Sequence, residues 1–213
     1  MTSPPDGPDA ALLSALTTEH FTLQGARTAT ILESSSRATL FLSAVTGTVV
    51  ALAFVGQVSR TGPTFVLFAL SLLPTALMIG VFTYARLLQS AIEDLTYARA
   101  INRIRSYYRT LDPAAERYLL MSPAEHLSGV LANAGMHRHR FHLLGHAATT
   151  VAVVDAALAG ATTGLAVTLL GAVSPGTAGG AGVGAAATTL GLLLAHQARA
   201  WNKAVDASPG ARS

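Results

Sequence analysis

Asp155 is the residue with the clearest potential for chemistry, because it interrupts a long apolar stretch. Residues 156–198, which follow it, contain no Asp, Glu, Lys or Arg. If its helix starts near Leu143, helical rise places the carboxylate about 18 Å along that helix, near the middle of a bilayer. A carboxylate there costs roughly 2.5–3.5 kcal/mol on insertion scales, so it should face a bundle interior or a water-filled cavity.

Two roles fit a carboxyl group in that position. Asp155 is either a proton or cation site, or a neutral packing residue held by hydrogen bonds. The second role is favoured because the other long apolar stretches offer no charged partner. Their hydroxyl side chains are the available neighbours: Thr46, Ser71, Thr75 and Thr188.

A basic run, HRHRFHLLGH, lies just before the apolar stretch that contains Asp155, and its last two histidines are His142 and His146. His142 and His146 are four residues apart and share a helix face, a spacing compatible with a divalent metal ion. No carboxylate adjoins them, and the sequence contains no cysteine. We interpret the run as a His/Arg collar at the headgroup layer, with a metal or pH-sensing site as the alternative. No cofactor is predicted.

Several arginines in the middle of the chain have no carboxylate four residues before them, the favoured arrangement for a helical ion pair. Attraction to an anionic leaflet is worth about 1 kcal/mol per basic residue. We therefore predict that four of them contact anionic lipid headgroups: Arg99, Arg103, Arg105 and Arg109. The alternatives are contact with a phosphorylated ligand and a solvated face that only fixes topology.

Two pairs of glycines four residues apart predict close helix packing. Gly160 and Gly164 follow Asp155, and Gly180 and Gly184 come later in the chain. Small residues at this spacing let helix backbones approach each other in lipid. They indicate either a homo-oligomer or packing of the third apolar helix on the fourth. The glycines of GTAGGAGVGAAATTLG are not a dinucleotide loop, because no strand precedes them.

The composition indicates a membrane protein. Hydrophobic residues make up 51% of the 213 residues and charged residues 12%, against about 25% charged in a typical soluble domain. The absence of cysteine excludes disulfides and thiolate metal sites. The net charge of +3 is the excess expected from cytoplasmic loops, so nucleic-acid binding is not predicted.

Three apolar stretches are long enough to cross a membrane, which takes about 20 residues: 38–59, 65–85 and Leu143–Gly171. A fourth, Gly180–Gln197, is weaker in length and hydrophobicity, and the distribution of basic residues decides for it. A turn at Ser59–Pro63 joins the first two into a hairpin, Pro74 predicts a kink in the second, and Pro175 breaks the helix after the third.

The distribution of basic residues predicts the orientation. With four spans, 13 basic residues lie on one side and only Arg60 on the other, so the positive-inside rule puts both termini in the cytoplasm. We therefore predict an all-α fold of two transmembrane hairpins with a helical cytoplasmic insertion between helices two and three. The segments are a cytoplasmic tail and juxtamembrane helix at 1–37, a hairpin at 38–85, an Arg-rich helical segment at 86–142, a hairpin at 143–198 and a cytoplasmic tail at 199–213.

The Arg-rich segment has helical signals of its own. Apolar and aromatic residues recur every three or four positions from Tyr97 to Leu111, so the second membrane helix is expected to continue through them. Asp112 and Pro113 predict a helix start, with the aspartate as N-cap. Ser122 and Glu125 have capping-box spacing ahead of a second helix.

The runs EHFTLQGARTATILESSSRATLFLSAVTGTVVALAFVG at 19–56 and LLQSAIEDLTYARAINRIRSYY at 87–108, with the late hydrophobic hairpin, carry a resemblance to a known group. The chain resembles a family of uncharacterised multi-pass integral membrane proteins of high-GC bacteria. The resemblance implies a bacterial cell membrane location and adds no site residues.

These features predict a non-enzymatic membrane protein that acts through assembly or through its cytoplasmic segment. The alternative is a small oligomeric channel or transporter that uses Asp155. A membrane-embedded enzyme ranks third.

Overall fold

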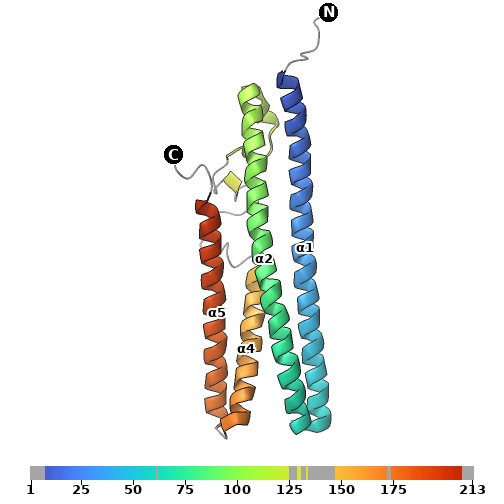
Figure 1. Cartoon of the computed structure of the whole chain (residues 1–213), viewed down its shortest axis with the longest axis vertical. Helices are drawn as coiled ribbons and strands as arrows, with labels where there is room; N and C mark the ends of the chain where they lie inside the picture. Colours follow the sequence, from blue (N-terminus) through green and yellow to red (C-terminus); the bar gives the residue numbers. More distant parts are fainter. Residues whose placement is uncertain are drawn as a thin grey trace, which may run out of the picture. The chain divides into compact units, whose positions relative to one another are not determined.

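The computed structural model describes residues 8–60, 62–124, 129–130, 133, 147–171 and 174–207. In that part of the chain all the regular structure is helical, which confirms the predicted all-α class (Figure 1). The elements are α1 (Pro8–Ser59), α2 (Pro63–Leu111), a short 3₁₀ helix η1 (Pro113–Tyr118), α4 (Ala147–Gly171) and α5 (Pro175–Asp206).

Four helices, α1, α2, α4 and α5, are each long and apolar enough to cross a membrane. They contain the four stretches expected from the sequence, apart from 143–146 of the third, which lie outside the described residues. They indicate a multi-pass membrane protein. Three of them begin at a proline, namely Pro8, Pro63 and Pro175. Proline suits this position because the first turn of a helix does not need its N–H, and the ring fixes φ near the helical value.

α1 and α2 both continue well beyond their apolar stretches. α1 is one helix of 52 residues, so the expected juxtamembrane helix is continuous with the first span. α2 has 49 residues and continues through Leu111, as its periodic pattern predicts, and it includes Pro74. The turn between them ends α1 with Arg60 at a φ of 46°, and the Gly62 N–H donates to the Ser59 carbonyl at 3.0 Å.

The fourth apolar helix was expected to start near Gly180, after a break at Pro175, and this start is wrong. α5 starts at Pro175 itself rather than near Gly180, and it runs for 32 residues. Ser174 explains the start, because its Oγ accepts a hydrogen bond from the Thr177 N–H at 3.3 Å and caps the first turn. The glycine-rich residues after Pro175 are therefore helical.

The chain packs as two units. Unit 1 comprises 1–33, 90–142 and 204–213, and unit 2 comprises 34–89 and 143–203. The core of unit 2 combines large and small apolar residues, including Phe41, Leu73, Ala76, Val151 and Ala152. Small residues dominate where α4 meets its neighbours.

Unit 1 is held by polar contacts as well as apolar ones. Ile101 and Ile104 on α2 are buried, whereas Leu111 on the same expected face is 51% exposed. Arg27 on α1 donates to both carboxylate oxygens of Asp94 on α2, at 2.7 and 3.3 Å. This two-bond pair has the favourable geometry of a guanidinium on a carboxylate.

A buried asparagine fixes the segment after η1 on α2. Asn102 Nδ2 donates to the Ala124 carbonyl at 2.7 Å, and Asn102 Oδ1 accepts from Asn133 Nδ2 at 3.1 Å. The predicted start at Asp112 is confirmed, because its Oδ1 accepts from the Ala114 N–H at 2.8 Å. Glu125, the second half of the expected capping box, lies outside the described residues.

Candidate functional site

Asp155 lies on α4 in a slot that Gly80 of α2 leaves open. The aspartate is 0% exposed. A Cβ atom at Gly80 would overlap its carboxyl group and would also lie 2.8 Å from Phe41 Cε2 on α1. The missing side chain of Gly80 is therefore what admits the carboxyl group between α2 and α4.

The carboxyl group of Asp155 has no hydrogen-bond partner for either oxygen among the residues that the structure describes. The hydroxyl neighbours considered from the sequence bond elsewhere: Thr46 to the Leu42 carbonyl, Ser71 to Leu67 and Thr75 to Ser71. An unpaired charge in such apolar surroundings is very costly, so this setting stabilises the neutral, protonated form.

Two further polar contacts in unit 2 join α5 to α4 and to α2. Gln197 Nε2 donates to Thr149 Oγ1 at 3.1 Å, and both side chains are buried. The Tyr84 hydroxyl donates to the Leu193 carbonyl at 2.6 Å. Buried polar groups need such partners. The sequence analysis missed these contacts, although Thr149 and Gln197 are polar residues near the ends of apolar stretches.

The backbones of α4 and α5 approach closely at glycines. A Cβ at Gly160 would lie 2.8 Å from the Gly182 carbonyl oxygen, and a Cβ at Gly164 would lie 3.3 Å from that of Ala178. Gly160 and Gly164 thus face the fourth helix of the same chain. Gly182, midway between the predicted Gly180 and Gly184, is their counterpart on α5. Gly180 and Gly184 have open space around them in the described chain.

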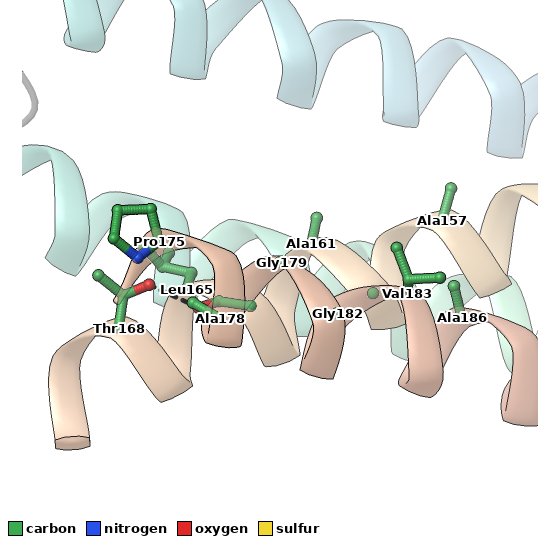
Figure 2. Close-up of a pocket in the computed structure, with 12 residues that line it drawn as sticks. Ala157, Ala161, Leu165, Thr168, Pro175, Ala178, Gly179, Gly182, Val183 and Ala186 are labelled. Carbon is green, nitrogen blue, oxygen red and sulfur yellow. Dashed lines mark hydrogen bonds between the residues drawn. The ribbon is translucent and has the colours of Figure 1, made fainter. Parts of the chain in front are cut away.

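A groove of about 610 Å³ follows this helix pair on one side (Figure 2). Eight of its twelve lining residues are alanine or glycine of α4 and α5, among them Ala157, Ala161, Ala178, Gly179 and Ala186. Ala157, Ala161 and Gly179 are exposed, so the groove is open along its length. Such a small, apolar lining would let another apolar helix approach closely.

The four arginines expected at anionic lipid divide into two pairs. Arg103 and Arg109 are exposed. Arg99 and Arg105 are half-buried in unit 1, where Arg99 Nη1 donates to the Ala204 carbonyl and Arg105 Nη1 to Asn102 Oδ1. Burial lowers the pKa of both guanidinium groups. Two of the four therefore also help to hold unit 1 together.

The structure does not test the predicted histidine collar, because His142 and His146 lie outside the described residues. Within the described ranges, no cluster of three or more His, Asp or Glu side chains could hold a metal ion.

No family model, curated protein or solved structure matches the chain. The resemblance to bacterial multi-pass proteins stays a prediction.

Proposed function

We propose that this chain is a non-enzymatic, multi-pass protein of the bacterial cell membrane that acts by assembling with copies of itself. The groove between α4 and α5 supports the proposal (Figure 2). Lipid is as apolar as a leucine side chain, so helices associate in a membrane through close packing of their backbones. A groove of glycine and alanine that one chain leaves uncovered suits a helix from another.

The first apolar stretch of a second copy has the surface to occupy this groove. Ser43, Gly47 and Ala51 are four residues apart, so they lie along one face of α1. Ser43 and Gly47 are exposed, and a Cβ at Gly47 would contact nothing in the described chain. The most apolar window of α1 is 6% buried within the chain. A contact of α1 with α4 and α5 is heterologous and closes into a ring when the rotation permits.

The topology in this proposal has two hairpins, with both termini and the Arg-rich segment 86–142 in the cytoplasm. The 13-to-1 division of basic residues supports it. The exposed residues Arg103 and Arg109 would then lie on the side of the anionic headgroups.

Cysteine cross-linking tests the assembly directly, because the natural sequence contains no cysteine. Copies carrying Gly47→Cys, mixed in liposomes with copies carrying Ala161→Cys, should form an interchain disulfide on oxidation. Both residues are exposed, and helical rise places them at similar depths, roughly 15–18 Å from the helix ends at Ser59 and Gly171. Gly184→Cys is the matched control, since it is open, lies at a similar depth on α5 and is outside the groove.

The outcomes separate three arrangements. Cross-linking at position 161 well above that at 184 supports the groove. Stronger cross-linking at 184 would move the contact to the face predicted from Gly180 and Gly184. Monomers in both mixtures, at high protein-to-lipid ratio, would refute assembly through α4 and α5.

A channel or transporter is the second candidate, favoured by the buried and unpartnered carboxyl group of Asp155. Its test is proton and cation flux into liposomes containing the wild type or Asp155→Asn. The amide keeps the size of the side chain and cannot carry charge. A wild-type flux that Asp155→Asn abolishes, with assembly unchanged, would establish transport. We expect no flux above that of empty liposomes, because residues packed beside Asp155 are apolar: Val151, Ala152 and Ala156.

A further inference from the structure

Unit 1 contains a cavity of about 320 Å³. α1 contributes His20, α2 contributes Arg105 and Tyr108, and the chain at the end of η1 and beyond contributes Tyr118 and 119–121. Small-molecule sites span about 300–1,000 Å³, so this cavity has room for a small ligand or for one headgroup. All of its walls belong to one unit.

The polar part of the cavity is positively charged. Arg105 uses Nη1 in its bond to Asn102 and pairs with no acidic residue in the described chain. A guanidinium group has five N–H donors, so most of them remain for a ligand. None of the residues that line the cavity is acidic. The cavity therefore favours an anion.

His20 adds a second polar group that lacks a partner. Its Nδ1 is buried without a hydrogen bond in the described residues, while Nε2 lies 2.7 Å from Gln24 Nε2. Leaving a buried nitrogen unsatisfied has a free-energy cost that a ligand oxygen would remove. Burial and, second, the charge of Arg105 lower the pKa of His20. A bound anion would act in the opposite direction and favour the protonated imidazole.

The rest of the wall is aromatic and aliphatic. The Tyr108 ring lies 6.3 Å from the His20 ring, which fixes one side. Tyr118 is 79% exposed at the other, with the Arg117 guanidinium carbon 5.3 Å from its ring centroid. Leu120 is 98% exposed. These side chains offer contact to the apolar part of a ligand, and Arg117 adds further positive charge close by.

We propose that this cavity binds a phosphate group joined to an apolar or aromatic body. More than one basic group around a single cavity suits a doubly charged phosphate, and the planar guanidinium fork matches its oxygens. The same chemistry occurs in an anionic lipid headgroup and in a soluble phosphate ester. The proposal does not depend on self-assembly, because unit 1 alone supplies the cavity.

The test is calorimetric titration of phenyl phosphate into the full chain in phosphatidylcholine nanodiscs. We expect saturable binding by the wild type. Arg105→Gln should weaken it about tenfold or more, since a hydrogen bond to a charged group is worth about 1.5–3 kcal/mol. Tyr118→Ala should weaken it too, and this exposed side chain can be removed without loss of packing. Arg199→Gln is the matched control, because Arg199 is exposed and outside the cavity.

Nanodiscs that contain phosphatidylglycerol identify the source of the phosphate. Suppressed phenyl phosphate binding in them supports a lipid headgroup as ligand, and unchanged binding supports a soluble ester. Absence of saturable binding in phosphatidylcholine nanodiscs would overturn the proposal. Wild-type affinity in both single variants, Tyr118→Ala and Arg105→Gln, would also overturn it. If Arg105→Gln alone fails to fold, Tyr118→Ala decides.

Discussion

Asp155 and Gly80 form a matched pair, in which one residue needs the space that the other leaves. Gly80→Ala places a methyl group against the carboxyl group and Phe41. Overpacking of this kind costs about 1–3 kcal/mol. We expect Gly80→Ala to lower the free energy of unfolding in detergent by that amount, as measured by denaturant titration.

The double variant makes this prediction specific to the pair. Asp155→Ala removes the group that the new methyl meets, so Gly80→Ala should cost less in its presence. The coupling between contacting residues is typically about 0.5–3 kcal/mol. Strictly additive effects would contradict the idea that Gly80 is a glycine for the sake of Asp155.

The sequence was sufficient to find Asp155 and insufficient to find Gly80. An acidic residue inside a charge-free stretch is visible from hydropathy alone. Gly80 becomes informative only when the register of α2 against α4 is known, and local periodicity does not supply that register. The hydroxyl groups considered as partners of Asp155 do not bond to it for a related reason. Serine and threonine hydroxyls in a helix can donate to the carbonyl four residues back instead.

At the scale of elements, the contact between α4 and α5 depends on glycines in register. Gly182→Ala would put its methyl carbon 2.8 Å from the Gly160 carbonyl oxygen, so the helices must separate. We expect a loss of about 1–3 kcal/mol in unfolding free energy, the usual range for overpacking. Loss of the close contact should be measurable as a lower thermal midpoint in detergent.

Gly184→Ala is the matched control for this prediction. Its new methyl group meets nothing within 4 Å in the described chain, so it should be neutral or stabilise the helix by about 0.5–1 kcal/mol. A stability loss as large as that of Gly182→Ala would mean that α5 faces α4 through its other side.

Helix identity was predictable, and helix ends were less so. Apolar length located three spans, and the distribution of basic residues decided for the fourth. The continuation of α2 beyond its apolar stretch followed from its three- and four-residue spacing. The start of α5 was misplaced because glycine and proline were weighed as breakers. A proline after a capping serine starts a helix, and the glycines that follow it lie in the helix already begun.

For the whole molecule, the division into units follows the charge pattern. Ten of the eleven acidic residues belong to unit 1, and Asp155 is the other. Unit 1 can therefore form ion pairs such as Arg27 with Asp94. In unit 2 the buried side chains of Thr149 and Gln197 bond to each other as neutral groups. The composition of unit 2 therefore suits lipid, and that of unit 1 suits water or headgroups.

The orientation of the chain follows from the same distribution and is directly testable. Fusions of alkaline phosphatase, which is active only outside the cytoplasm, at Gly62 or Gly176 should be active. Gly62 lies in the turn between α1 and α2, and Gly176 in the first turn of α5. A fusion at Glu125, in the Arg-rich segment, should be inactive. Moving that segment across the membrane would oppose the positive-inside bias of eight arginines in 86–142.

A reporter that is active only in the cytoplasm, such as a fluorescent protein that fails to fold after export, supplies the control. It should give the reciprocal pattern at the same three positions. Replacing Arg103 and Arg109 by Gln leaves six arginines in 86–142 and should not invert the chain, because orientation depends on the sum of basic residues near the spans. Phosphatase activity at Glu125 in the wild type would reverse the arrangement of all four spans. It would also place the cavity at Arg105 outside the cell.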